Sequence, residues 1–394
     1  MMENKEWKES KIKEIAEVIG GGTPRTDNSD FWNGDIPWIT PRDLTGYSKM
    51  YISKGERMIT NEGLKGSSTR LLPKGTVLLT SRAPIGYVAI AENEICTNQG
   101  FKSLVLNEEL TYNKFIYYWI KNNVEYLQSI GTGTTFAEIS GNVVKEIDIK
   151  LPPLPEQKAI ASVLSSLDDK IDLLHQQNQT LEALAETLFR QWFIEEAKED
   201  WEDCTIGDLA IHSKVSIHPK KNQDTLYHHY SIPSFDANKK PVVELGKEIQ
   251  SNKYAVQTNS ILFSKLNPHK DKRVWLILDK VEDNAICSTE LQVVKPKEDK
   301  YLFFLYGWLT HPMYYNEIAS GVGGTSGSHQ RIDPKSIFSA PCVHINESLI
   351  DEYNNHAEPL FKKQFENQQQ IQTLTKLRDT LLPKLMSDEV RVKV

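Results

Sequence analysis

A repeating pattern of apolar positions begins just after Pro155 and continues for about forty residues. Apolar side chains recur at alternating intervals of four and three, which is the spacing of a coiled-coil seam. The positions are Ile160, Leu164, Leu167, Ile171, Leu174, Asn178, Leu181, Ala185, Leu188 and Trp192. Pro155 suits the first turn of a helix, where its missing N–H costs no hydrogen bond. The pattern predicts one long helix, and its single polar member, Asn178, is of the kind that fixes helix register.

A second stretch near the C-terminus has the same spacing with more polar members. Its positions are Ile350, Tyr353, Ala357, Leu360, Gln364, Asn367, Ile371, Leu374, Arg378 and Leu381. Pro383 is expected to end or kink this helix. Each helix could simply cover the core of its own domain. The regularity of the first pattern and its presence in two copies instead favour an antiparallel coiled coil, with one globular domain at each end of a rod.

Elsewhere the apolar residues fall in short segments and not along a helical stripe. "GDIPWIT", "GTVLLTS" and "RVWLILD" are rich in β-branched and aromatic residues and predict strands. "WNGD", at Trp32 to Asp35, contains the Asn-Gly pair that is typical of a hairpin turn. Strands mixed with helical segments predict the α/β class for both globular regions.

The two globular regions are copies of one another. "LPKGTVLLTSR" at residues 72–82 resembles "VQTNSILFSKL" at residues 256–266, and "NEICTNQGFKSLV" resembles "NAICSTELQVV". The loops "GTGTT" and "GVGGT" follow in the same order, each ahead of a β-like segment, a proline and a long helix. Such a repeat indicates duplication. It predicts a first domain at 1–152, a first spacer helix at 153–200, a second domain at 201–346 and a second spacer helix at 347–394.

The bulk composition is typical of a globular cytoplasmic protein. The 394 residues are 39% hydrophobic, and the longest apolar run, "YLFFLYGWL", is too short to span a bilayer. Four widely separated cysteines suggest neither a disulfide framework nor a zinc site. The net charge is −7, and residues 151–200 alone hold 4 basic and 10 acidic side chains. Both globular regions are close to neutral, so the overall charge does not exclude a polyanionic partner.

No catalytic or nucleotide-binding motif stands out in the sequence. "GGGTPR", at residues 20–25, lacks the Lys-Ser/Thr pair of a P-loop, and its repeat partner "IHSKVS" keeps none of the glycines. Neither a metal-ligand cluster nor a nucleophile-elbow signature is present. Two diverged copies joined by a rod favour a binding module that is not an enzyme. The alternatives are a coiled-coil scaffold with two protein- or peptide-binding domains, and an enzyme with an unrecognised site in each domain.

The order of these elements resembles that of the specificity subunits of type I restriction–modification systems, over essentially the whole chain. The resemblance rests on "PLPEQKAI" with the heptads after it, on "LRDTLLPKLMS", and on "GGGTPR…FWNGDIPWIT". It implies two target-recognition domains, each contacting one half of a split, asymmetric site in double-stranded DNA. It also implies that the helices set the spacing of the half-sites and dock two methyltransferase subunits.

The same resemblance implies that catalysis lies outside this chain. S-adenosylmethionine, ATP and magnesium are then expected on partner subunits, which include restriction and translocase subunits in the full complex, and no cofactor is expected here. The second domain departs from the family pattern, because it lacks the Gly-Gly-Thr-Pro and Trp-Asn-Gly-Asp elements. The second helix also begins with "HINESLID" where the family favours a Pro-x-x-Glu-Gln start.

Polar and basic residues on Gly- and Pro-rich loops are the candidates for DNA contact, because only base-edge contacts specify a sequence. In the first domain these are Thr23, Arg25, Arg42, Arg82, Asn98, Gln99, Thr134 and Thr135. In the second domain these are Lys265, Asn267, His269, Lys270, Lys272, Arg273, Ser326, Ser328, His329, Gln330 and Arg331. Arg25, Arg82 and Arg331 are the strongest, because arginine can donate two hydrogen bonds to guanine. Trp32 and Trp38 are expected in the core and not stacked on bases.

Overall fold

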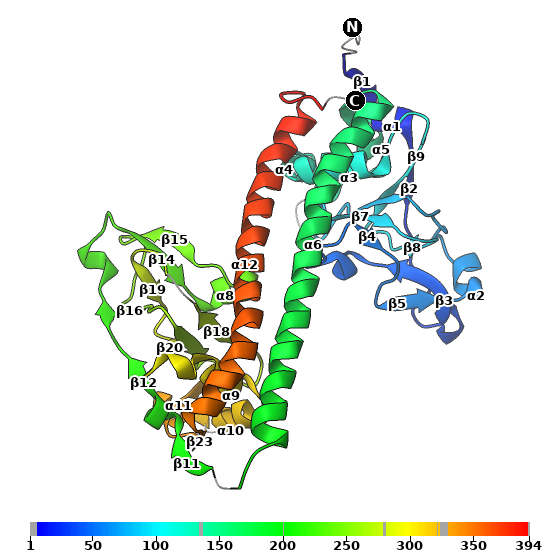
Figure 1. The fold of residues 1–394 in the computed structure, drawn as a ribbon. Helices are drawn as coiled ribbons and strands as arrows, with labels where there is room; N and C mark the ends of the chain where they lie inside the picture. Colours follow the sequence, from blue (N-terminus) through cyan, green and yellow to red (C-terminus); the bar gives the residue numbers. More distant parts are fainter. Residues whose placement is uncertain are drawn as a thin grey trace. The chain divides into compact units, whose positions relative to one another are not determined.

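The computed structural model describes residues 6–133, 137–199, 201–278, 281–320, 322–323 and 330–392. The chain divides into two compact units. The first unit comprises Met1–Leu174 with Gln370–Val394, and the second comprises His175–Gln369. Each unit therefore combines one globular domain with a part of each long helix (Figure 1).

The first unit contains a five-stranded sheet of order β2-β9-β6-β7-β4, a three-stranded sheet of order β5-β3-β8, and the pair β1-β10. The strands are β1 (Lys8–Lys11), β2 (Ala16–Gly20), β3 (Trp32–Ile39), β4 (Tyr51–Ile52), β5 (Arg57–Ile59), β6 (Val77–Leu79), β7 (Val88–Ala91), β8 (Cys96–Thr97), β9 (Lys102–Leu106) and β10 (Asp148–Leu151). The helices are α1 (Ile12–Ile15), η1 (Ser29–Phe31), η2 (Pro41–Leu44), α2 (Asn61–Lys65), α3 (Asn113–Asn122), α4 (Val124–Ser129) and α5 (Gly141–Lys145). Helix α3 packs against β6 and β7.

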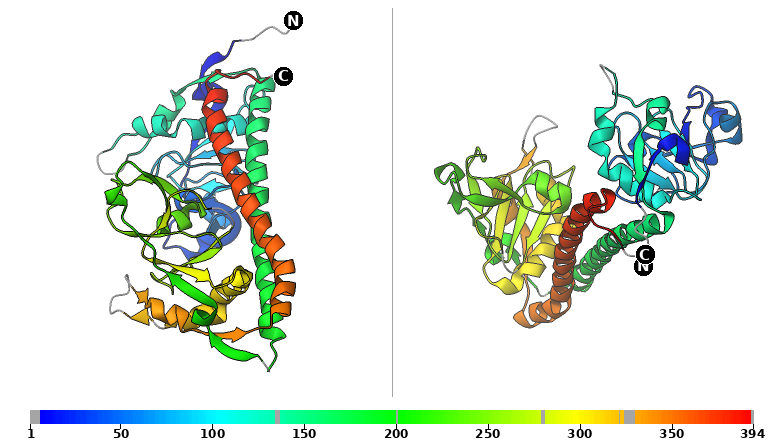
Figure 2. Two further views of the ribbon diagram at one scale, coloured as in Figure 1. Left: turned by 60° about the vertical axis from the view of Figure 1, so that its left-hand side comes forward. Right: turned by 90° about the horizontal axis from the view of Figure 1, so that it is seen from above.

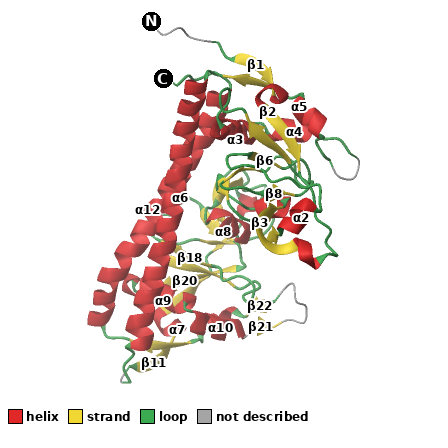
Figure 3. Ribbon diagram, turned by 90° about the vertical axis from the view of Figure 1, so that its right-hand side faces the viewer, coloured by secondary structure: helices red, strands yellow, loops and turns green. Residues whose placement is uncertain are grey.

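The second unit repeats this plan with a four-stranded sheet of order β12-β20-β17-β18, a five-stranded sheet of order β13-β16-β19-β14-β15, and the pairs β11-β23 and β21-β22 (Figure 3). The strands are β11 (Glu202–Thr205), β12 (Ala210–Ser213), β13 (Ser216–Ile217), β14 (Leu226–Tyr230), β15 (Val242–Leu245), β16 (Lys253–Ala255), β17 (Ser260–Ser264), β18 (Val274–Ile277), β19 (Ala285–Cys287), β20 (Leu291–Pro296), β21 (Val322–Gly323), β22 (Arg331–Ile332) and β23 (Pro341–His344). The helices are α7 (Ile206–Leu209), η4 (Pro219–Lys221), α8 (Ile232–Asn238), η5 (Asp299–Tyr301), α9 (Leu302–Thr310), α10 (Pro312–Ser320) and α11 (Pro334–Phe338).

The strand registers confirm the predicted duplication. In the first unit, Val77 of β6 pairs with Leu104 of β9, and in the second, Ile261 of β17 pairs with Val294 of β20. These pairs lie inside the aligned segments of the sequence repeat. These strands pair antiparallel in both units. In the first unit β9 lies between β2 and β6, and in the second unit its counterpart β20 lies between β12 and β17. The two similar α/β domains therefore share one four-strand arrangement, β2-β9-β6-β7 in the first and β12-β20-β17-β18 in the second.

The long helices α6 (Leu154–Arg190) and α12 (Glu347–Met386) run antiparallel within each unit (Figures 1 and 2). In the first unit Ile171 and Leu174 pack against Ile371. In the second unit Asn178 contacts Asn367 through their side-chain amides. The predicted antiparallel coiled coil is confirmed. After α6, one turn of π-helix, η3 (Gln191–Glu195), ends the helical segment.

The α12 boundary differs from the prediction. Its last residue is Met386, so the helix continues for one turn past Pro383. The N–H of Ser387 donates to the Pro383 carbonyl (3.0 Å), which closes that final turn. A proline removes only its own N–H from the hydrogen-bond ladder, and packing of Leu385 and Met386 in the first core holds the turn in place.

The ends of the helices also cover the domain cores, which is the alternative to a coiled coil that the sequence left open. Ile160 and Leu164, near the start of α6, are fully buried in the core of the first unit. Phe189, at the end of α6, and Tyr353, near the start of α12, are buried in the core of the second unit. The seam of purely interhelical contacts is correspondingly short, because ten of the twenty seam positions pack in the two domain cores.

One local interpretation of the sequence needs correction. Asn33 has a positive φ of 62°, as an Asn-Gly turn requires, but it lies inside β3. Both Trp32 and Ile36 of β3 pair with Ile59 of β5, so "WNGD" forms a bulge and not a hairpin turn. The cysteines are free thiols, although Cys204 and Cys342, which are far apart in sequence, lie directly opposite each other in β11 and β23. None of the helices in the described residues is long and apolar enough to cross a membrane.

Candidate nucleic-acid interface

In the first unit, three predicted loops meet on a short backbone ladder that continues from β6. The N–H of Ser81 donates to the Gly100 carbonyl (2.7 Å), and the N–H of Ile139 donates to the Ser81 carbonyl (3.0 Å). Arg82 and Glu138 then lie opposite each other in an antiparallel bridge. The ladder joins the segments around residues 81, 100 and 138, which the sequence alone does not connect.

Glu138 holds two cations on this ladder. Its carboxylate lies 3.5 Å from Nη1 of Arg82 and 3.1 Å from Nζ of Lys102. The side chains of Arg82 and Glu138 are each 36% exposed, so the pair remains accessible from solvent. The sequence interpretation considered basic and neutral polar residues of loops, so it missed Glu138, which is acidic, and Lys102, which lies in β9. The signal that could have found Glu138 is its place three residues after the repeated Gly/Thr loop.

Other predicted residues of the first domain surround the ladder. Gln99 accepts a hydrogen bond from the Thr23 hydroxyl and is the neighbour of Gly100. The Oδ1 of Asn98 accepts a hydrogen bond from the Gly100 N–H (2.9 Å), so this side chain shapes the loop. The structure therefore brings Thr23, Asn98 and Gln99 to the segment that carries the ladder.

Arg25 and Arg42 form exposed ion pairs of their own. Arg25 Nη2 lies 2.9 Å from Asp27, and this hydrogen bond lowers the pKa of the Asp27 carboxyl. Arg42, in η2, lies 3.8 Å from Glu56. Trp32 and Trp38 are buried, as predicted.

The second unit has the same backbone ladder after β17. The N–H of Lys265 donates to the Glu290 carbonyl (2.9 Å), and the N–H of Ile332 donates to the Lys265 carbonyl (2.9 Å). Leu266 and Arg331 lie opposite each other in an antiparallel bridge. Comparing the two ladders gives the equivalent positions Ser81 and Lys265, Arg82 and Leu266, Gly100 and Glu290, Glu138 and Arg331, and Ile139 and Ile332.

The second ladder also carries an arginine beside a glutamate, but these two residues occupy other ladder positions than Arg82 and Glu138 do in the first. Arg331 forms a bidentate pair with Glu290, from Nε to Oε2 (3.1 Å) and from Nη2 to Oε1 (3.1 Å). This hydrogen-bonded pair raises the pKa of the Arg331 guanidinium. The Arg331 side chain is 47% exposed. Glu290, like Glu138, was not among the predicted residues.

Asn267 and Gln330 extend this ladder by one step. The N–H of Asn267 donates to the Gln330 carbonyl (2.8 Å), and the N–H of Gln330 donates to Oδ1 of Asn267 (3.2 Å). Asn267 has a positive φ of 48°, which asparagine tolerates better than most residues. The turn that follows contains His269 and Lys270, both exposed.

Two predicted residues are held by polar contacts within the second unit. Arg273 is only 12% exposed and is held by Asp236 (2.7 Å) and Asp271 (2.7 Å). Lys272 donates from Nζ to the Thr310 carbonyl (2.9 Å). Five predicted residues lie outside the described part of the chain, namely Thr134, Thr135, Ser326, Ser328 and His329.

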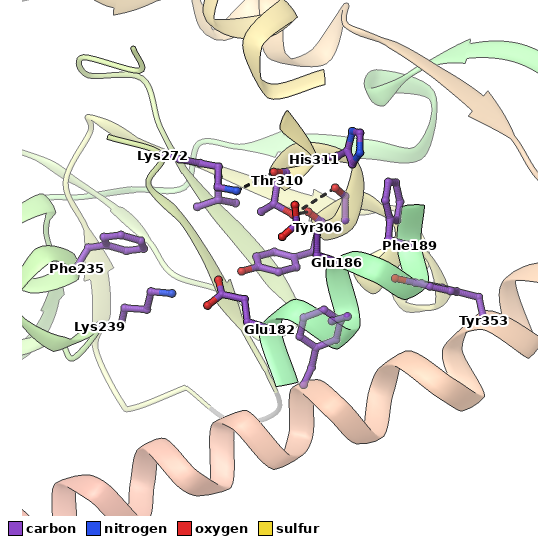
Figure 4. Close-up of a pocket in the computed structure, with 14 residues that line it drawn as sticks. Glu182, Glu186, Phe189, Phe235, Lys239, Lys272, Tyr306, Thr310, His311 and Tyr353 are labelled. Atoms are coloured by element: carbon purple, nitrogen blue, oxygen red, sulfur yellow. Dashed lines mark hydrogen bonds between the residues drawn. The ribbon is translucent and has the colours of Figure 1, made fainter. Parts of the chain in front are cut away.

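Lys272 also lines a pocket between α6, α9 and β18, with a cavity volume of ≈ 70 Å³ (Figure 4). Glu182 and Glu186 line it from α6, and Tyr306 and His311 line it from the other side. Burial raises the pKa of Tyr306 and lowers that of His311, so both side chains favour their neutral forms. Among the described residues, no three His, Cys, Asp or Glu side chains gather in an arrangement that could hold a metal ion.

Residues 4–183 match the family model of the type I restriction modification DNA specificity domain. The type I restriction enzyme MjaIX specificity subunit of Methanocaldococcus jannaschii is 36% identical, over 99% of this chain and 94% of its own length. The EcoR124I/EcoR124II specificity subunit of Escherichia coli is 31% identical over 41% of each chain. Among solved structures, the type I restriction-modification S subunit from M. genitalium has a TM-score of 0.64 at 16% identity, covering 98% of both chains.

The chain, with its two similar α/β domains and paired helices, thus shares the fold of that S subunit over nearly its whole length. It belongs to the family of type I restriction enzyme specificity subunits. The family and the fold expected from the sequence are both confirmed.

Proposed function

We propose that this chain recognises a split, asymmetric sequence in double-stranded DNA, with each unit contacting one half. The observation that carries the proposal is the repeated ladder. In each unit it gathers residues predicted to contact DNA onto one accessible surface and presents an arginine there. Arginine can donate two hydrogen bonds to guanine in the major groove, which is the commonest specific contact to DNA.

The difference between the two ladders supports an asymmetric site. Arg82 stands opposite Glu138 in the first ladder, whereas Leu266 stands opposite Arg331 in the second. Different side chains at equivalent backbone positions present different donors and acceptors to the bases. Two domains of one topology would then recognise two different half-sites.

We further propose that the chain works in a complex with methyltransferase and restriction subunits. The two long helices set the distance between the half-sites and dock two methyltransferase subunits, one for each half of the repeated helix pair. This chain itself is non-catalytic. S-adenosylmethionine, ATP and magnesium act on the methyltransferase and restriction subunits, and the complex works in the cytoplasm.

The test is co-expression with the methyltransferase subunit of a type I system, followed by sequencing of modified DNA. The expected result is one bipartite, non-palindromic motif that disappears when this chain is omitted. Light scattering of the purified complex should give two methyltransferase subunits per chain. A palindromic motif, or a stable complex with one methyltransferase subunit at saturation, would contradict the proposal.

A further inference from the structure

We propose that Glu138 and Glu290 are positioning residues, each of which orients the arginine that discriminates bases in its own half-site. The inference rests on the proposed DNA-recognition function and assigns roles to two carboxylates within it. In each unit the arginine and the glutamate come from different segments and meet only on the ladder. The pairs are Arg82 with Glu138 and Arg331 with Glu290.

The different placement of the arginine and the glutamate in the two ladders argues against a purely structural ion pair. Glu138 and Arg331 occupy equivalent positions of the two ladders and have opposite charges. An ion pair needed only to hold the ladder together would not need a different pair of positions in each unit, because the backbone hydrogen bonds are the same in both units. What both units retain is one exposed arginine held by one carboxylate.

The geometry of Arg331 shows how such a carboxylate can position an arginine without blocking it. Glu290 occupies Nε and one side of Nη2. In the described part of the chain no acceptor contacts Nη1, so the edge formed by Nη1 and the second hydrogen of Nη2 remains available for a bidentate contact with guanine. A fixed guanidinium also loses less side-chain entropy on binding than a mobile one.

The local charge supports binding to a polyanion. In the first unit Glu138 is shared by Arg82 and Lys102, which leaves one excess positive charge. The carboxylate therefore orients the arginine without cancelling the attraction of the surface for phosphate. Since these side chains are partly exposed, the pairs contribute little to the stability of the fold. Their place on the ladder is better explained by recognition.

The experiment uses the complex with its methyltransferase subunits and the bipartite site found by sequencing. Duplexes in which one half-site is randomised compete with the intact site, so that discrimination is measured separately for each half. Glu138→Gln keeps the shape of the side chain and removes its charge. We expect it to lower discrimination about 3- to 10-fold at one half-site only, and Glu290→Gln to do so at the other. Arg82→Ala and Arg331→Ala should cost about 5- to 150-fold at the same halves.

A second readout separates positioning from damage to the fold. Removing a negative charge beside DNA should raise affinity for random duplex, whereas a misfolded unit should lower it. The unaltered half-site in the same molecule reports whether the rest of the chain is intact. Glu17→Gln is the matched control, because Glu17 forms an exposed ion pair with Arg70 (3.3 Å) outside the ladder.

Several results would overturn the inference. Equal losses at both half-sites, or discrimination no different from that of Glu17→Gln, would leave Glu138 and Glu290 without a positioning role. Either result would leave the recognition function itself intact. If the unsubstituted complex discriminates no bipartite site at all, it is the proposed function that fails.

Discussion

Asn178 of α6 and Asn367 of α12 meet where the two helices pair in the second unit, with Nδ2 of Asn367 3.0 Å from Oδ1 of Asn178. Each residue is a polar member of the seam pattern of its own helix. Asn367 is 1% exposed, and among the described residues its own Oδ1 has no hydrogen-bond partner. Gln364 adds a bond from Nε2 to the Asn178 carbonyl (3.0 Å). A buried polar pair of this kind selects one alignment of two helices at a cost in stability.

The asparagine pair predicts a non-additive effect on stability. Asn178→Leu should lower the free energy of unfolding by about 1–2 kcal/mol, because the buried amide of Asn367 loses its main partner. The double substitution with Asn367→Leu should restore it to the original value or above, since no buried amide remains. Guanidinium unfolding of the single and double variants measures this. Additive losses would show that the pair contributes through packing and not through its hydrogen bond.

Asp168 links both helices to the first domain. Its carboxylate accepts hydrogen bonds from Tyr118 Oη (2.7 Å) and Arg378 Nη1 (2.8 Å). Asp168→Ala should destabilise the first unit by about 2–4 kcal/mol, because the Tyr118 phenol loses its acceptor and the mostly buried Arg378 guanidinium loses one of its two carboxylate partners, the other being Asp379. Faster hydrogen exchange in α3 would locate the effect. Glu366→Gln, which removes an exposed ion pair with Lys363, should change almost nothing.

The second unit has an apolar contact in place of the Asp168 contacts. Alignment of Trp119 with Trp308 makes Gly307 the counterpart of Tyr118. A Cβ on Gly307 would lie 2.2 Å from Cδ2 of Phe189. Gly307→Ala should therefore destabilise the second unit by about 1–3 kcal/mol, although alanine ordinarily favours a helix.

Two variants test this explanation of Gly307. Phe189→Leu in the Gly307→Ala background should recover part of the stability, because it removes the ring atoms that clash. Gly141→Ala is the control, since its Cβ would meet only the Lys102 side chain at 3.8 Å. Thermal unfolding of the three variants distinguishes the outcomes. An equal loss for both glycine substitutions would point to the backbone and not to the clash.

The length of the helices should set the length of DNA between the half-sites. Four residues inserted after Gln177 add about 6 Å to α6, which corresponds to one to two base pairs at ~3.4 Å each. Because α6 pairs with α12 in both units, a matching insertion in α12, for example after Gln368, should be needed to keep the pairing. Methylation mapping should then show a longer spacer with unchanged half-sites. An unchanged spacer in an active complex would mean that the helices do not measure DNA.

Acid should weaken the second unit before the first. Burial lowers the pKa of His212, His229 and His311 from the ordinary value of about 6.5. The unfolded chain then binds more protons than the folded one, so stability falls as the pH drops below about 6.5. Neither segment of the first unit contains a histidine, and its Glu146, with a pKa lowered to about 2 by Lys13 and Lys11, loses its charge only in stronger acid.

Hydrogen exchange at pH 7.5 and 5.5, corrected for intrinsic rates, shows which unit loses stability first. Protection in β17 and β20 should fall, while protection in β6 and β9 should be retained. Replacing the three histidines by glutamine should remove the difference between the two pH values. A loss of protection that is the same in both units would rule out the histidines as its cause.

The sequence by itself determined the two long helices, several strands and the duplication. The seam positions, Asn178 among them, follow a spacing that repeats along the chain. The aligned segments around Val77 and Ile261 indicated that the two domains have corresponding strands. The sequence also predicted the local backbone conformation at Asn33, which has the positive φ that an Asn-Gly pair favours. It did not predict that this residue lies in a bulge, because the bulge depends on the pairing of β3 with β5.

Only the tertiary structure decided which residues meet. Arg82 and Glu138 are separated by more than fifty residues in sequence, and nothing local requires a carboxylate beside that arginine. The same holds for Cys204 opposite Cys342, and for the polar contacts of Asp168 in one unit where the other has Phe189 against Gly307. Hydrophobic spacing is a property of neighbouring residues, whereas an ion pair on a ladder depends on strand register, which the sequence encodes only through the packing of the whole domain.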